Sequence, residues 1–97
     1  MAKSYNELRD EFLRQRMQFI LAELDAGMTF AQVAQNERGL GNAERAARNI
    51  GHAMMAYEEA RRRLAECQRE DSPAEFDLTE RKLAVLEETI SNLHPAT

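Results

Sequence analysis

A chain of 97 residues is long enough for one domain and too short for two, because domains usually run to roughly 100–150 residues. Strong helix formers dominate it, and only four glycines and two prolines interrupt it. The net charge of −4 argues against nonspecific nucleic-acid binding, which needs a field of Lys and Arg. No apolar run approaches the ~20 residues of a membrane span, and no secretory signal pattern is present, so we expect a cytoplasmic protein that does not bind membranes.

The first predicted helix covers residues 5–26. Ser4 and Glu7 have the spacing of a capping box, in which the hydroxyl accepts from a free backbone N–H and the longer side chain reaches back. Gly27 is predicted to end the helix in the left-handed conformation. Apolar side chains three to five residues apart share one face of the helix, and we expect that face to enter the core: Tyr5, Leu8, Phe12, Met17, Ile20 and Leu24.

A short second helix is predicted over residues 30–38. Thr29 and Gln32 form another possible capping box, while Met28 and Val33 have the spacing of a hydrophobic staple. We therefore expect this helix to turn tightly off the first and to sit across one end of the bundle. Residues 39–42, which include two glycines, form the clearest predicted loop.

Two further long helices are predicted over residues 43–70 and 73–93. The third helix carries a seam at spacings of three and four, half of it alanine, so a neighbouring helix can approach closely: Ala43, Ala46, Ile50, Ala53, Tyr57, Ala60, Leu64 and Cys67. The last helix opens at Ser72, Pro73 and Glu75 and repeats such a seam at Phe76, Thr79, Leu83, Leu86, Ile90 and Leu93. The short link between them favours antiparallel packing. The expected fold is all-α: a single domain over residues 1–97, built as a small antiparallel bundle of three long helices and one short helix.

Part of this pattern is shared with a known repeat family. On the first side of a turn glycine, Gly41, stand a large aromatic, a branched and a small residue, which are Phe30, Val33 and Ala34. On its other side stand a small, a large and a small residue, which are Ala46, Ile50 and Ala53. In these positions residues 27–60 resemble a single degenerate tetratricopeptide repeat. The pattern departs from the family at Glu37 and Glu58. Residues 53–60 are also similar to the Ala- and Tyr-rich helix of microtubule-interacting and trafficking domains. Either resemblance implies binding of a peptide or a helix.

A second resemblance leaves a DNA-binding function open. Residues 29–40 are similar to the start of a helix-turn-helix, with Val33 on its first helix and Gly39 in its turn. The next helix would then present Arg45 and Arg48 to a DNA groove. A regulatory DNA-binding protein is therefore the alternative function.

Catalytic constellations are weak in this sequence. His52 lies in the middle of a long helix, as in histidine phosphotransfer domains, but Met55 and Ala56 stand where those domains have a lysine and a glycine. Such a site would lack its main electrostatic support. His52, Cys67 and His94 show no metal-ligand spacing, and Cys67 at a seam position is expected to pack as a small hydrophobic residue. We therefore expect no enzyme activity, no cofactor and no metal.

Apolar residues outside the main stripes suggest an interface. Phe19 and Leu21 lie outside the stripe of the first helix, and Ala47 and Met54 flank the seam of the third. Exposed apolar patches usually mark binding surfaces. The sequence therefore predicts a small protein–protein interaction module that associates with itself as a homodimer, with these four residues as its interface.

Overall fold

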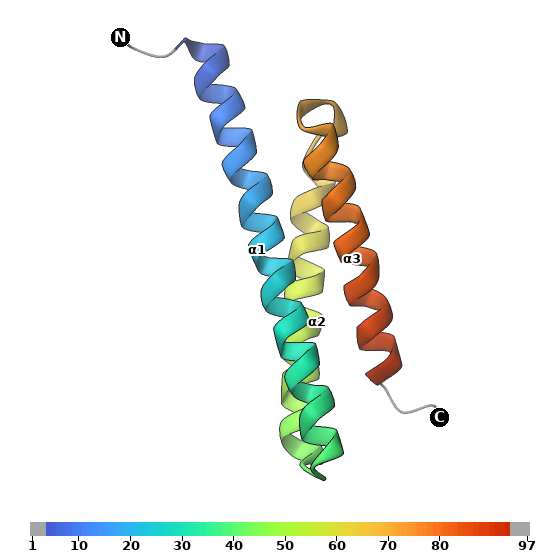
Figure 1. The fold of residues 1–97 in the computed structure, drawn as a ribbon. Helices are drawn as coiled ribbons and strands as arrows, with labels where there is room; N and C mark the ends of the chain where they lie inside the picture. The colour runs from blue at the N-terminus through green and yellow to red at the C-terminus, as the bar shows by residue number, and fades with distance from the viewer. Residues whose placement is uncertain (1–3, 94–97) are drawn as a thin grey trace.

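The computed structural model describes residues 4–93 and is all-α over that range, as expected. It contains three α-helices and one turn of 3₁₀-helix (Figure 1): α1 (Tyr5–Gly39), α2 (Ala43–Ala65), η1 (Arg69–Asp71) and α3 (Pro73–Leu93). His94 lies outside the described residues.

The helices form an elongated bundle in which α1 and α2 run in opposite directions and α3 runs opposite to α2 (Figure 1). Ion pairs between helices set the register. Arg16 on α1 meets Glu66, just past the end of α2, at 2.6 Å. Lys82 on α3 meets Asp25, near the middle of α1, at 2.8 Å. The helix α1 thus packs against both others, and its N-terminal end extends past η1 (Figure 1), although Arg9 still pairs with Asp71 of η1 at 3.2 Å.

The two helices predicted before residue 39 are one continuous helix, so the expected short helix across the end of the bundle is wrong. Gly27 does not end α1 but is buried within it, where an added Cβ would lie 3.0 Å from Ala56 Cβ. The Thr29 hydroxyl does not cap a new helix and instead donates to the carbonyl of Asp25, four residues earlier, at 3.1 Å. The glycine serves close packing between helices, which the local sequence alone does not distinguish from a helix end.

Both ends of α1 follow the predicted local chemistry. The Ser4 hydroxyl accepts from the Glu7 backbone N–H at 3.2 Å, which confirms the N-cap. At the other end, Asn42 N–H donates to Glu37 O at 2.8 Å and Gly41 N–H donates to Arg38 O at 3.1 Å. Gly41 has a φ of +81°, so these bonds complete a Schellman motif that reverses the chain into α2.

The predicted third helix is too long, because α2 ends at Ala65 and not near residue 70. Glu66 and Cys67 tighten the last turn by donating to carbonyls three residues back, and Gln68 is extended. Arg69 in η1 then holds Asp77 of α3 through two hydrogen bonds of 2.9 Å. These residues reverse the direction of the chain before Pro73. Ser72 is not helical, because a proline disfavours helical geometry at the residue that precedes it. The bounds of the last helix, 73–93, are confirmed.

The core is small, and among residues 4–93 no aromatic side chain is fully buried in it, although Tyr57 and Phe76 pack against it half-buried. Its buried apolar residues are Met17, Ile20, Leu24, Ala31, Ala34, Ala46, Ile50, Ala53, Ala60, Leu64, Leu86, Ile90 and Leu93. Thr79 is buried with them, and its hydroxyl donates to the Glu75 carbonyl at 2.6 Å. The expected core positions Tyr5, Leu8 and Phe12 are wrong, since all three are exposed. The five alanines at the helix contacts allow close approach, and aliphatic side chains such as Ile20, Leu24 and Leu86 fill the space between the helices.

Among the described residues, no helix carries an apolar stretch long enough to cross a lipid bilayer.

Candidate interaction surfaces

The exposed aromatic residues all lie on α1, in a line along one face. Tyr5, Phe12 and Phe19 are 79%, 63% and 55% exposed, and Phe30 is 36% exposed. A residue every seven positions, from Tyr5 to Val33, is apolar and exposed. We call the following set the aromatic seam: Tyr5, Leu8, Phe12, Phe19, Ala22, Ala26, Phe30 and Val33. A seven-residue repeat drifts only about 20° per repeat on a straight helix, so the seam winds slowly around α1.

The aromatic seam lies on the flank of α1 next to α2. The Arg63 guanidinium of α2 sits over the Phe19 ring, with 4.7 Å between Cζ and the ring centroid. Further along, the Phe30 and His52 rings are 5.0 Å apart between centroids. The helix α3, by contrast, reaches α1 through Lys82 and Asp25, neither of which belongs to the seam. The seam is therefore open to solvent on the side away from α3.

Charged residues form a ladder beneath the seam, where α1 meets α2. Arg63 pairs with Glu59 at 2.9 Å and approaches Glu23 of α1 at 3.8 Å. Glu59 also accepts from Arg62 at 2.5 Å, and hydrogen bonding by Arg62, with a further contribution from Arg63, lowers the pKa of Glu59. These pairs join charges of opposite sign, and exposed pairs of this kind contribute little stability. Of these pairs, the one between Arg63 and Glu23 joins α1 to α2, while the pairs of Glu59 lie within α2 and orient the two arginines.

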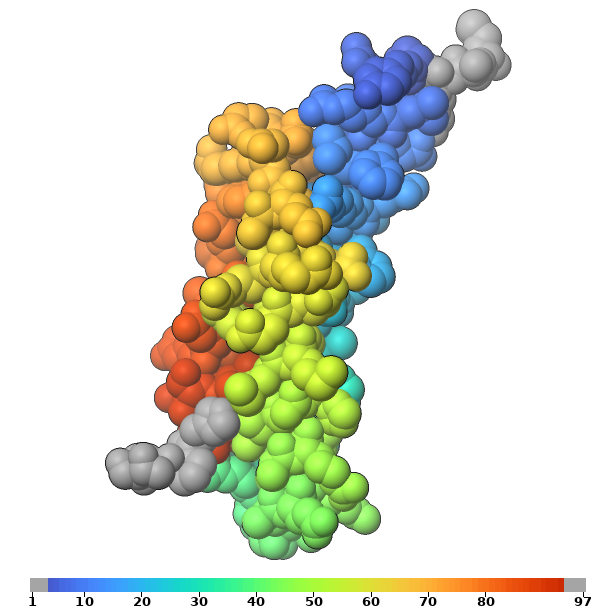
Figure 2. Space-filling model, turned by 180° about the vertical axis from the view of Figure 1, so that it is seen from behind, coloured from blue at the N-terminus to red at the C-terminus, as the bar shows by residue number. Residues whose placement is uncertain are grey.

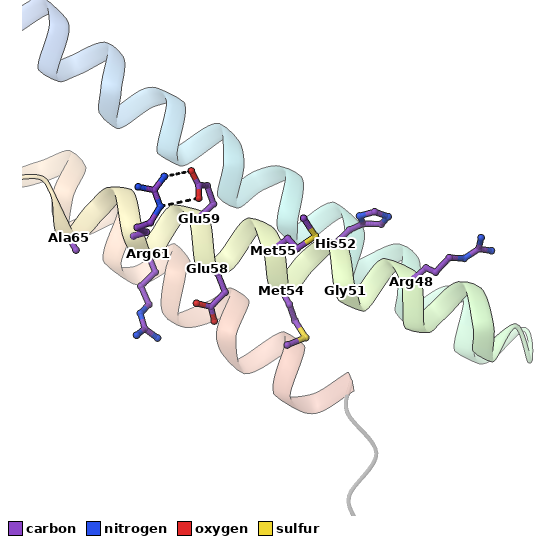
Figure 3. Close-up of a pocket in the computed structure, with 10 residues that line it drawn as sticks. Arg48, Gly51, His52, Met54, Met55, Glu58, Glu59, Arg61 and Ala65 are labelled. Carbon is purple, nitrogen blue, oxygen red and sulfur yellow. Dashed lines mark hydrogen bonds and ion pairs between the residues drawn. The ribbon is translucent and has the colours of Figure 1, made fainter.

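The outer side of α2 forms a second open surface, which is shallow because every residue that lines it belongs to the same helix. Gly51 leaves open space there, with nothing within 4 Å of an added Cβ. Figure 3 shows His52 and Met55 on the α1 side of the helix and Met54 with Glu58 on the opposite side. Met55 is 70% exposed. In the space-filling view from behind, this stretch of α2 crosses the middle of the molecule (Figure 2).

The four predicted interface residues do not form one surface. Phe19 is exposed and belongs to the aromatic seam. Leu21 is two positions further along α1 and thus about 200° around the helix, where it is partly covered. Ala47 and Met54 are both exposed and share a face of α2, since they are two turns apart. Of the four predicted interface residues, only Phe19 belongs to the aromatic seam.

Sequence reasoning missed most of the aromatic seam. It assigned Tyr5, Leu8 and Phe12 to the core, and it placed Phe30 and Val33 on a separate short helix. The seven-residue spacing from Tyr5 to Val33 was the available signal. It becomes visible only when α1 is read as continuous through Gly27.

The titratable residues considered for catalysis are not brought together. His52 is exposed against Phe30, whereas Cys67 is half-buried and its thiol donates to the Arg63 carbonyl at 3.5 Å. Burial raises the pKa of the Cys67 thiol, with nearby Arg16 opposing that shift, so the site disfavours the nucleophilic thiolate. Within residues 4–93, no group of three or more His, Cys, Asp or Glu side chains is arranged to hold a metal ion.

No protein-family model matches the chain, and no curated protein or solved structure is significantly similar to it. The tetratricopeptide resemblance therefore stays a prediction, with Gly41 in the turn between two helices but α1 much longer than a helix of that repeat. The two helices of a helix-turn-helix cross at about 90–120°. Here α1 and α2 lie side by side and antiparallel, so this geometry does not favour the DNA-binding alternative.

Proposed function

We propose that this chain is a small protein–protein interaction module that associates with itself as a homodimer and has no catalytic activity of its own. The observation that carries the proposal is the distribution of aromatic residues: alanines occupy much of the core, while four aromatic side chains lie exposed on α1. Aromatic residues are enriched at protein interfaces and dominate their binding energy. A line of them on one helix is difficult to explain by the stability of an isolated chain.

The size of the aromatic seam supports this proposal. At about 200 Å² per aromatic side chain, the exposed fractions of Tyr5, Phe12, Phe19 and Phe30 amount to roughly 450 Å². The largest apolar patch on a typical monomer is about 300–600 Å², and patches of this kind are often functional. Leu8, Val33 and two alanines extend the line further. The seam thus matches the largest apolar patch of a typical monomer in area, and its concentration of aromatic side chains supports a functional role.

The area also fits what a homodimer requires. A stable interface takes about 800 Å² from each partner, and about 65% of a homodimer interface, or about 520 Å², is apolar. The four aromatic side chains supply roughly 450 Å² of one partner's share, and Leu8 and Val33 add to it. The polar residues that flank the seam on α1 would form the rim.

The test compares seam residues with exposed apolar residues on another helix. The double variant Phe12→Ala/Phe19→Ala should raise the dimer dissociation constant by about a hundredfold or more, because aromatic anchors often cost 2 kcal/mol or more each when truncated. The matched control is Leu78→Ala/Val85→Ala on α3, at side chains 37% and 52% exposed. Sedimentation equilibrium measures both constants. The proposal of a homodimer through this surface fails if the two double variants weaken association equally, or if the unmodified chain never associates.

A further inference from the structure

The aromatic seam is asymmetric along its length. Its N-terminal half carries large side chains, Tyr5, Leu8, Phe12 and Phe19, whereas its C-terminal half begins with Ala22 and Ala26. Phe30 and Val33, at its far end, are the least exposed of its large side chains. The side chains of the N-terminal half therefore protrude further from α1 than those of the C-terminal half, so the two halves have complementary shapes.

We infer that two copies of the chain pair α1 against α1 in antiparallel orientation, with the two-fold axis crossing the helices between Ile20 and Leu21. This inference rests on the proposed homodimer. In this register Phe19 of one copy packs on Ala22 of the other, and Phe12 packs beside Thr29 and Phe30. Leu8 packs beside Val33 at each end. Leu8, Phe12 and Phe19 of each copy then face the C-terminal half of the partner's seam, whereas Tyr5 lies opposite Asn36, beyond the end of the seam.

Parallel pairing fits the same seam poorly. It would place Phe12 against Phe12 and Phe19 against Phe19, then Ala22 against Ala22 and Ala26 against Ala26. Helix axes in contact are 8–10 Å apart depending on the side chains between them. Two bulky layers followed by two small ones would need a separation that changes along the pair. The antiparallel register spreads the bulk more evenly, because Phe19 faces Ala22, while the less exposed Phe30 and Val33 face Phe12 and Leu8.

The position of the seam agrees with this pairing. It lies on the flank of α1 next to α2 and away from α3, as the contacts of Phe19 with Arg63 and of Phe30 with His52 place it. The α1–α2 hairpin of one copy can thus face the hairpin of the other, with the two α3 helices outside. The same patch serves both subunits, as a closed two-fold interface requires.

Disulfide crosslinking tests the register. Leu8→Cys and Val33→Cys are made separately in a Cys67→Ala background, and the helix content of each variant is checked by circular dichroism. In the antiparallel register Leu8 of one copy neighbours Val33 of the other, whereas two Leu8 positions lie 25 residues apart, or about 38 Å along the axis. A disulfide requires Cα atoms within about 7 Å. Under mild oxidation, a mixture of the two variants should form covalent dimers at least tenfold faster than either variant alone.

The outcomes separate this inference from the proposed function. Crosslinking within each single variant at least as fast as in the mixture would mean parallel pairing and would overturn the register while leaving the homodimer. A homodimer by mass that forms no crosslink in any sample would also overturn the inference, because Leu8 of one copy would then not neighbour Val33 of the other. Monomer mass for the unmodified chain would overturn both.

Discussion

Gly27 and Leu86 are in such close contact that a Cβ added at Gly27 would lie 2.8 Å from Leu86 Cδ2. This approach brings α1 and α3 together at the centre of the bundle, and Leu86 is fully buried there. The glycine is therefore a packing residue within a continuous helix.

Gly27→Ala should destabilise the fold by about 1 kcal/mol. Alanine gains about 1 kcal/mol in helix propensity, but overpacking costs about 1–3 kcal/mol, and Ala56 Cβ, at 3.0 Å from the added Cβ, cannot rotate away. The matched control is Gly51→Ala, at a helical position with nothing within 4 Å, which should gain about 0.5–1 kcal/mol. Urea unfolding at one protein concentration measures both. Equal stabilisation by the two substitutions would mean that the contact around Gly27 is loose.

Phe12→Ala should change the stability of the monomer by less than about 0.5 kcal/mol, because surface substitutions away from special features have small effects. Phe12 is 63% exposed, whereas Ile20, two turns further along α1, is fully buried. Ile20→Ala should cost about 2–5 kcal/mol through lost burial and the cavity it leaves. Unfolding is measured in dilute solution, where light scattering gives the monomer mass. A large loss from Phe12→Ala there would place this ring in the core after all.

Cys67 should react slowly with a disulfide reagent at pH 8, because burial raises the pKa of its thiol and lowers the thiolate fraction. The comparison is Ala65→Cys in a Cys67→Ala background, which places a thiol at a neighbouring exposed position. The reaction is followed by absorbance, and guanidinium should bring both variants to the same rate. If the native Cys67 reacts as fast as the exposed thiol, the account of its environment is wrong.

The same shift has a consequence for stability. Because the pKa of Cys67 is higher in the folded state, the unfolded chain loses the thiol proton first as pH rises. The contribution of Cys67 to the free energy of unfolding is therefore fully present below the ordinary pKa of 9.0 and is lost as pH rises through the folded pKa. Cys67→Ser, whose hydroxyl does not titrate in this range, should therefore weaken the decline in unfolding free energy between pH 8 and 10. An identical decline in both proteins would contradict this assignment. Tyr57 acts in the same direction at higher pH, since burial, together with its hydrogen bond to Glu87, raises its pKa.

Local chemistry predicted some elements closely. Pro73 fixed the start of α3, and the turn at Gly41 followed from its glycines, because these residues act through their own backbone. Gly27 misled the prediction because a glycine can end a helix or admit a neighbour, and only the position of Leu86 decides between the two. Tyr5, Leu8 and Phe12 misled it because α1 carries two apolar stripes. The stripe that includes Gly27, Ala31 and Ala34 is the one that allows close helix packing, so it became the core.

The measurement that tests the central claim most directly is the molar mass of the unmodified chain by light scattering across a concentration series. The account predicts a rise from the chain mass of 11.1 kDa toward twice that value as concentration increases, because burying the aromatic seam favours the homodimer. A mass that stays at 11.1 kDa up to millimolar concentration would contradict it, since a seam of this size should then give at least weak association.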